Sequence, residues 1–445
     1  MKINVTAVIA IMATLMFCAL FASTAQAVIP AVNAPVWNQG DSWAMGKSVD
    51  LDAEFSNQLN QIQHMLENMT NATSLDEFQV QAMASSWLKV EVVTANAEEY
   101  VLHGKLAARF NADVAISVTG EMPAVGTKAW TDFNYPKTPR TISADISLDM
   151  AFVSEMTIVF EKPTMAIKSI ETMNKASAIA SVNIMNIPEI KLNLSGISYS
   201  YKNIDFDINF DMELNVGASF SPALNLIKFP LSVGDNWTIS SLASITGNVS
   251  GFLDVKGLSA SDKESLFSNS MLQNAGITDF PIDFSKLSTE NEPKIVNGTF
   301  LMAPRYVNAS MECTGVELVT LPIFGEVAVY EISANGGSEK FYYSDDVHFL
   351  TGAESSLEGI EMPVELGGVQ MPEAMISMEP VTAQEAEQNI NSISAYQSDL
   401  SGQAGNSNGD GLTGLLSNVA IVGLIVVIVA LAAVVAVVIV KSKKK

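Results

Sequence analysis

The chain has 445 residues, with 24 basic and 48 acidic side chains and a formal net charge of −24. Charge of this sign repels nucleic acid and anionic lipid headgroups, so a nucleic-acid-binding role is excluded. The acidic side chains are expected to form a solvated surface.

The N-terminus has the pattern of a secretory signal peptide. Met1-Lys2 is a short basic start, residues 5–20 are apolar, and Ala25-Gln26-Ala27 is a small-x-small cleavage site. We therefore predict a signal peptide over residues 1–27. The alternative is an uncleaved anchor, for which the apolar run is barely long enough.

Residues 28–220 predict an N-terminal unit in which helices precede an antiparallel sheet. Gly40-Asp41-Ser42-Trp43 follows a Pro-containing lead-in. Apolar residues at helical spacing predict a helix over residues 51–69, and Ser74 with Glu77 has the capping-box pattern of a second helix through about residue 85.

The period changes to two near residue 87, which predicts strands. We expect strands over residues 89–95, 100–110, 114–119 and 142–152, with 156–160 either continuing the last or returning from it. The Pro-rich residues 135–140 predict a loop or an edge. Alternation resumes over residues 190–201, where Ser195-Gly196 is interpreted as a β-bulge.

Residues 203–217 give the clearest strand pattern in the chain. Apolar side chains from Ile204 to Val216 alternate with polar ones from Asp205 to Asn215, so we expect a long strand with one wet face. The acidic residues are a candidate for calcium, but a flat strand face spreads its oxygen atoms apart, so a solvated face is favoured.

Residues 229–380 predict a second unit. Gly234-Asp235-Asn236-Trp237 repeats the earlier Gly-Asp-x-Trp, which is a hint of duplication. We expect strands over residues 245–255, 299–309, 311–321, 326–333 and 340–344, with a hairpin turn at Asn335-Gly336-Gly337. A helix is expected over residues 262–275, and two edge strands over residues 348–378.

The second unit resembles a known family. The relevant segments are Pro230 to Trp237, then Cys313-Thr314-Gly315-Val316-Glu317, Phe324-Gly325-Glu326 and Phe341-Tyr342-Tyr343. Together they are similar to archaeal and bacterial surface proteins with a domain like the periplasmic lipoprotein carriers of the LolA/LolB type. The resemblance implies a curved antiparallel half-barrel that wraps helices around an apolar cavity, and it transfers no catalytic residue.

The C-terminus predicts a tether and an anchor. Residues 381–414 predict a loose helix over 383–400, with Ile390, Ile393 and Leu400 on one side, and then a Gly/Ser/Asn-rich linker. Residues 415–440 are apolar and long enough to span a bilayer. The lysines of residues 441–445 place that end in the cytoplasm, which predicts a single-pass protein with its ectodomain outside the cell membrane.

The predicted ectodomain is strongly acidic and contains a single cysteine. Without Lys2 and the four terminal lysines, 19 basic and 48 acidic residues remain, a net charge of −29. Cys18 lies in the predicted signal peptide, so Cys313 has no partner for an intramolecular disulfide. Cys313 is then either a buried apolar residue or, as a minority interpretation, an intermolecular bridge.

No catalytic, metal or cofactor motif is present in the sequence. The histidines His64, His103 and His348 lack metal-ligand spacing, and Ser86-Trp87-Leu88-Lys89 lacks the partner motifs of penicillin-interacting enzymes. We therefore expect a protein that is not an enzyme. Seven N-x-S/T sequons are candidate glycosylation sites: Asn68, Asn71, Asn193, Asn236, Asn248, Asn297 and Asn308.

The predicted fold class is α+β and mostly β. We expect one or more curved antiparallel sheets or a half-barrel, covered by a few helices, with two tandem units as an option. Methionines and phenylalanines on predicted inner faces are candidate lining residues of an apolar cavity: Met150, Phe152, Phe206, Phe210, Met212, Met302 and Met311.

The leading hypothesis for function is a membrane-tethered module that binds a lipid or another apolar ligand. The simpler alternative is that the methionines only fill a large β core and line no cavity. The rival function is a structural or adhesive surface glycoprotein that contacts other surface proteins, and a surface-polymer hydrolase is the third.

Overall fold

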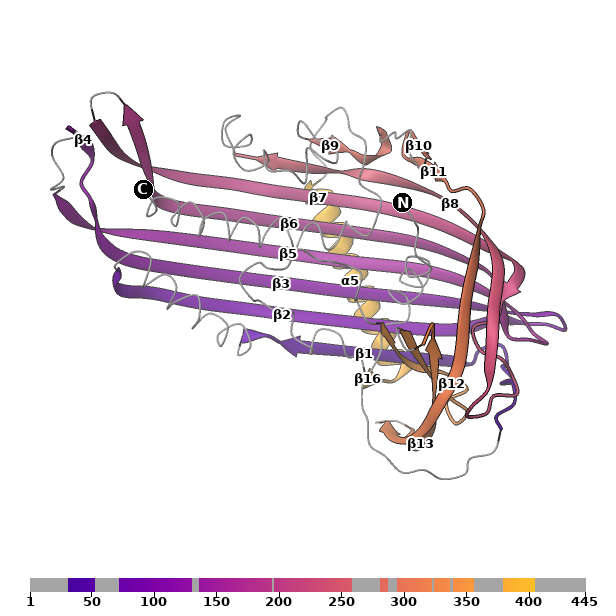
Figure 1. Ribbon diagram of the computed structural model, residues 1–445. Coiled ribbons are helices and arrows are strands. Elements are labelled where there is room, and N and C mark those ends of the chain that lie inside the picture. Colours follow the sequence, from indigo (N-terminus) through magenta and orange to yellow (C-terminus); the bar gives the residue numbers. More distant parts are fainter. Residues whose placement is uncertain are drawn as a thin grey trace.

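The computed structural model describes residues 31–52, 72–129, 136–193, 196–257, 281–286, 294–321, 324–336, 339–355 and 379–404. Their strands form one 16-stranded antiparallel sheet (Figure 1). Its main path runs in the order β15-β14-β13-β12-β8-β7-β6-β5-β3-β2-β1-β16. The fold is therefore mostly β, with a single open sheet rather than a closed barrel.

Neighbours in the sheet are mostly neighbours in sequence, as expected for a meander. The first half contains β1 (Ser42–Asp50), β2 (Ala72–Ala95), β3 (Glu99–Pro123), β4 (Gly126–Ala129), β5 (Lys137–Glu161), β6 (Ala166–Asn193) and β7 (Gly196–Leu224). The second half contains β8 (Asn236–Lys256), β9 (Ile282–Asp283), the 3-10 helix η1 (Phe284–Lys286), β10 (Lys294–Val296), β11 (Thr299–Leu301), β12 (Arg305–Leu321), β13 (Gly325–Ala334), β14 (Glu339–Ser344) and β15 (Phe349–Ser355). β16 (Glu379–Pro380) and the helix α5 (Ala383–Ala404) follow.

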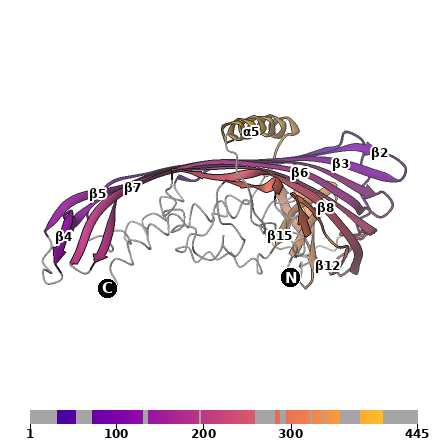
Figure 2. The same ribbon diagram turned by 90° about the horizontal axis from the view of Figure 1, so that it is seen from above.

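The sheet is an arch, and α5 crosses the strands on its outer side (Figure 2). β12 and β15 turn down on the inner side of the arch at one end. The two faces bury different clusters. Leu88 and Leu106 belong to the large inner cluster, whereas the adjacent Trp87 and Ala107 belong to a small cluster with Ala386 and Ile390 of α5. Adjacent residues of a strand point to opposite faces, which explains the division.

The strands of the first half are longer than predicted. Residues 100–119 form parts of one strand, β3, and residues 142–160 lie within β5, which also includes Pro139 of the predicted loop. The predicted helix over residues 74–85 is wrong, because these residues pair with β3 within β2. Helix-forming Ala, Met, Gln and Glu residues favour a helix locally, but a full-length ladder of hydrogen bonds to a neighbouring strand overrides that preference.

Two further predictions need correction. Gly196 is not a bulge within a strand, since it pairs with Asn193 at the hairpin between β6 and β7. The two strands predicted over residues 299–309 and 311–321 are instead the short β11 and the long β12. The predicted helices over residues 51–69 and 262–275 lie almost entirely outside the described residues, as do most of residues 348–378 and the whole of the predicted span 415–440.

The two Gly-Asp-x-Trp segments form the same turn. The Asp41 carboxylate accepts from the Asn38 backbone N–H at 2.7 Å, and the Asp235 carboxylate accepts from that of Ser232 at 2.8 Å. Gly40 and Gly234 have φ of 94° and 89°, a left-handed conformation that favours glycine. Trp43 and Trp237 are each the second residue of the strand that follows, β1 and β8.

The turns are also anchored in the same way to the neighbouring strands. Gly40 donates to Val92 O and Gly234 to Cys313 O, at 2.9 and 2.8 Å. A register shift follows each of these partners, between Val92 and Thr94 and between Cys313 and Gly315. The two halves therefore share a local design, although β7 and β8 join them in one sheet from Asp207↔Lys256 to Ser221↔Leu242.

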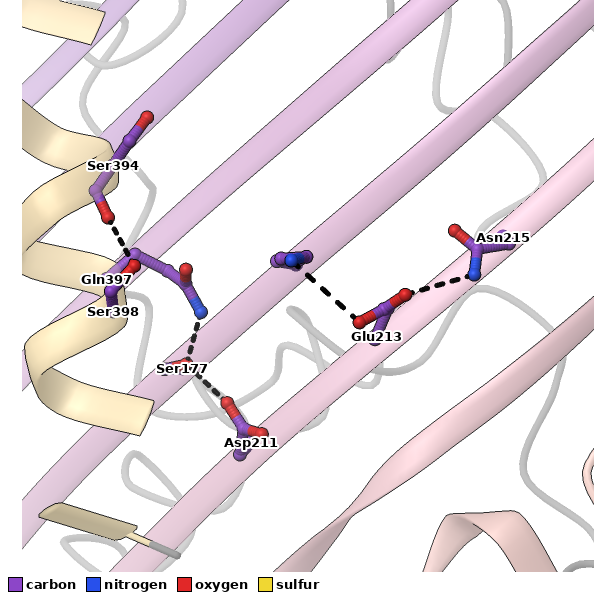
Figure 3. Close-up of polar contacts among 8 residues, drawn as sticks. Ser177, Asp211, Glu213, Asn215, Ser394, Gln397 and Ser398 are labelled. Atoms are coloured by element: carbon purple, nitrogen blue, oxygen red, sulfur yellow. Dashed lines mark hydrogen bonds and ion pairs between the residues drawn. The ribbon is translucent and has the colours of Figure 1, made fainter. Parts of the chain in front are cut away.

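The helix α5 is docked by apolar and polar contacts. Ile390, Ile393 and Leu400 are buried, as their spacing predicts. The Gln397 side-chain amide donates to Ser177 Oγ at 2.8 Å, and Ser177 donates to Asp211 Oδ1 at 2.6 Å (Figure 3). Residues 383–404 therefore lie on the sheet. Among the described residues, no helix is both long and apolar enough to cross a membrane.

Candidate functional site

The inner side of the arch carries a continuous apolar surface, which we call the concave apolar face. It consists of the even-numbered residues of four neighbouring strands: 102–118 of β3, 142–160 of β5, 170–184 of β6 and 204–220 of β7. None of these residues is charged, and all but three are apolar. Strict alternation along strands of about 25 residues produces such a face, because every second side chain points the same way.

All seven predicted lining residues belong to the cluster on this inner side. Phe206, Phe210, Met212 and Met311 are buried. Met150, Phe152 and Met302 are partly buried and pack against the same cluster. Five of them lie on β5 and β7, whereas Met311 lies in β12 and Met302 between β11 and β12. Their lining of a cavity stays a prediction.

Sequence reasoning missed the middle of this face. Ala176, Ala178 and Ala180 of β6, which we call the alanine strip, lie between two rows of larger side chains. One row is Leu148, Met150 and Phe152 of β5, and the other is Ile208, Phe210 and Met212 of β7. The alternation of Ala with Ser and Ile, which continues into Val182 and Ile184, is the sequence signal that could have placed these alanines on the inner face.

One end of the face is sealed by an aromatic cluster. Trp37 packs against Tyr100 and Phe160 with ring centroids 5.2 and 5.4 Å apart, and Trp43 stacks on Phe349 at 4.6 Å. Offset and edge contacts at these distances are favourable beyond the area that they bury.

Hydrogen bonds from the two indole rings to backbone carbonyls hold the same cluster in place. The Trp43 indole N–H donates to Val347 O at 2.7 Å, and that of Trp37 donates to His348 O at 2.8 Å. The segment between β14 and β15 is thereby tied to the start of β1, far away in sequence. The inner side of the arch is closed by protein at this end.

The outer side of the sheet carries charged side chains beside the apolar cluster under α5. Asp149, Asp207 and Asp211 face outward, and the Tyr396 hydroxyl of α5 donates to Asp149. Burial and the Asp149 carboxylate raise the pKa of Tyr396 to about 12. The Arg109 guanidinium lies 3.6 Å from the centroid of the Tyr396 ring. The charged side chains of these strands therefore lie on the outer side, whereas the concave apolar face carries none.

Three predicted glycosylation sites share the outer side. Asn236 and Asn248 of β8 and Asn308 of β12 are exposed, and in a strand each sequon's Asn and Ser/Thr point the same way. Asn297 is exposed in the turn between β10 and β11. Asn193 ends β6, while Asn68 and Asn71 lie outside the described residues.

Groups suited to acid–base or metal chemistry are dispersed. Among the described residues, no three His, Cys, Asp or Glu side chains gather where they could hold a metal ion. His103 lies in β3 and His348 just before β15, whereas His64 lies outside the described part of the chain. Cys313 is fully buried, and this burial, reinforced by Asp235, raises the pKa of its thiol to about 11. A neutral buried thiol is a poor nucleophile.

The fold and this site define an open antiparallel sheet whose two faces differ sharply in polarity. No protein-family model, curated protein or solved structure matches the chain.

Proposed function

We propose that this protein is a membrane-tethered, non-enzymatic binding module that holds a lipid or another apolar ligand on its concave apolar face. The observation that carries the proposal is the absence of charge from that face over four adjacent long strands. Several of its members, including Phe110, Ile146 and Phe152, are only partly buried where they pack against the inner cluster. Apolar surface that is not fully covered by its own protein is a typical ligand-binding surface.

The predicted topology supports the same proposal. A signal peptide over residues 1–27 and a span over residues 415–440 would display the sheet outside the membrane. The LolA/LolB-type resemblance of residues 229–380 suggests a curved half-barrel that carries a lipid-modified or lipid ligand. We include two tandem units in this proposal because both halves begin with the same anchored Gly-Asp-x-Trp turn.

Native mass spectrometry of the full chain, released from detergent, tests the proposal. We expect the wild type to retain an adduct of lipid mass. Ala178→Leu should lose it, because the larger side chain fills the alanine strip between Met150 and Phe210. Ile179→Leu is the matched control, since Ile179 points to the outer face and the change conserves volume. A wild-type chain without any adduct, or an adduct retained equally by Ala178→Leu, contradicts the proposal.

A structural or adhesive surface glycoprotein is the second candidate. The observation that favours it is the exposure of Asn236, Asn248 and Asn308 on the outer side, where glycans would meet other surface proteins. Glycopeptide mass spectrometry of the native protein tests it. We expect modified peptides for these three sites, and their complete absence would remove the argument for a glycosylated contact surface.

A further inference from the structure

An exposed aromatic ring lies on the outer side of the second half of the sheet. Tyr306 of β12 is 68% exposed. The alternation of β12 places Val307 and Ala309 in the inner cluster, so Tyr306, Asn308 and Ser310 point outward. A single exposed apolar side chain is ordinary in a folded protein, so the surroundings of Tyr306 decide what the ring can do.

The side chains around Tyr306 form an uncharged surface, which we call the hydroxyl face. Tyr306 lies opposite Leu242 of β8, and Asn308 lies opposite Ser240. The hydroxyl face consists of Ser219 and Ser221 of β7, Asn236, Thr238, Ser240, Leu242, Ser244, Thr246 and Asn248 of β8, and Tyr306, Asn308 and Ser310 of β12. All but Leu242 carry a hydroxyl or amide group, and along β12 charge resumes only at Glu312.

Asn308 connects the exposed ring to a modification site. It is the asparagine of an N-x-S/T sequon and lies two residues after Tyr306 on the same side of β12. Two residues of a strand span about 7 Å, so the ring is within reach of the first sugar of a glycan on Asn308. Tyr306 is the only aromatic residue two positions before any of the seven sequon asparagines. In the other two sequons of the hydroxyl face, Gly234 and Thr246 occupy that position.

The chemistry of a pyranose sugar suits this ring and its surroundings. One face of the sugar presents C–H groups, whose small positive charge is attracted to the negative face of an aromatic ring. The hydroxyl groups of the sugar can exchange hydrogen bonds with the Ser, Thr and Asn side chains around Tyr306. Because the hydroxyl face carries no charge, a neutral glycan that lies on it strips no ion of its water.

We propose that Asn308 carries a neutral N-linked glycan whose first sugar packs on the Tyr306 ring, so that the glycan lies on the hydroxyl face and stabilises the fold. This inference rests on the second candidate function, the glycosylated surface protein, and names the site and its contact. Covalent attachment holds the sugar at a high local concentration, so a contact too weak to retain a free sugar forms here. Glycans on Asn236 and Asn248, which lack an aromatic neighbour at this position, extend into solvent.

A double-mutant cycle on the full chain, purified with its native glycans, tests the contact. Ser310→Ala removes the sequon and keeps Asn308, whereas Tyr306→Thr removes the ring and keeps a residue that favours strands. In the glycosylated chain, Tyr306→Thr should lower the folded-to-unfolded ratio about three- to tenfold, the range of aromatic packing contacts. Guanidinium unfolding in detergent measures this ratio. In the Ser310→Ala background the same change should alter it less than about twofold.

Thr238→Ala is the matched control. It removes the sequon of Asn236 on the same face, where Gly234 takes the place of the aromatic residue. Its effect and that of Tyr306→Thr should be additive. Nitration of the folded chain with tetranitromethane gives a second readout, followed by mass spectrometry of the β12 peptide. Tyr306 should react about three- to tenfold more slowly in the wild type than in Ser310→Ala, because the sugar covers the ring.

The outcomes separate this inference from the candidate function on which it rests. Glycopeptide mass spectrometry should find Asn308 modified. An unmodified Asn308 overturns the inference while modified peptides at the other two sites of the hydroxyl face leave the glycosylated surface standing, and absence of glycans from all three overturns both. If Asn308 is modified but Tyr306→Thr and Ser310→Ala are additive, the contact is refuted. Equal coupling of Tyr306→Thr to Thr238→Ala, or equal nitration with and without the glycan, refutes it too.

Discussion

Gly46 has no room for a side chain, and this makes Gly46→Ala a sharp test of how β1, β2 and α5 pack together. A Cβ atom at Gly46 would lie 2.0 Å from Cε3 of Trp87, its direct partner in β2. Ordinary contact begins at 3.4 Å, so the ring would have to move by about 1.4 Å. Trp87 is 7% exposed and packs in the cluster that contains Ala386 and Ile390 of α5, so it has little space to move.

We expect Gly46→Ala to lower the free energy of unfolding by about 1–3 kcal/mol, the usual cost of overpacking. Guanidinium unfolding of the full chain in detergent, followed by circular dichroism, measures this change. Gly217→Ala is the matched control, since its Cβ would meet only Thr246 Oγ1 at 3.7 Å. This control should be neutral or stabilise by up to about 1 kcal/mol, as Ala replaces Gly inside a strand.

A double-mutant cycle decides whether the Trp87 ring is the cause. Trp87→Leu alone destabilises by truncating a buried side chain, but it also removes the obstructing ring. In that background Gly46→Ala should cost less than about 0.5 kcal/mol, which would give a large coupling energy. If Gly46→Ala costs the same in both backgrounds, the steric reasoning is refuted.

Four further predictions concern Phe210, Cys313 and Tyr396. Phe210→Ala should destabilise by about 3–5 kcal/mol in the same unfolding assay, because Phe210 is 5% exposed; a cost below 1 kcal/mol would show that the face is not packed. Cys313 should resist iodoacetamide at pH 7.5 until denaturant is added, and rapid labelling of the folded chain would contradict its burial. The raised pKa of this thiol means that the unfolded state loses the proton first, so stability should fall as pH rises from about 9 to about 11, and Cys313→Ala should flatten that fall. Tyr396→Phe should cost about 1 kcal/mol by removing the hydrogen bond to Asp149, and an unchanged unfolding midpoint would show that this contact does not hold α5.

The side chains of the four long strands are divided between the two faces by polarity. Acidic and amide side chains of β7 stay on the outer side, where Asp211 also receives a hydrogen bond from Ser177 beneath α5. The inner side remains free of charge. Because alternate residues of each strand alternate between the faces, a register slip of one residue would exchange the faces, so the pattern itself fixes the pairing.

Local patterns along the chain predict the strand character of residues 89–95, 100–110, 114–119, 142–152 and 203–217, the hairpin turn beginning at Asn335 and the helix over residues 383–400. These features depend on local alternation, on left-handed turn residues and on one apolar helical stripe, all of which can be read along the chain. Alternation also shows which side chains of one strand share a face, and the seven candidate lining residues were chosen largely on that basis; a cavity lined by them stays a prediction.

Only the tertiary structure decided what those faces meet. Residues 74–85 have helix-forming side chains, but pairing with β3 makes them a strand. The alanines of β6 carry little hydrophobic signal, and they matter because larger residues of β5 and β7 lie on either side. The aromatic cluster joins Trp37 and Trp43 to Val347 and His348, which are distant in sequence. Local patterns state which side of a strand is apolar, whereas strand order and sheet curvature determine which apolar sides meet and where they leave room.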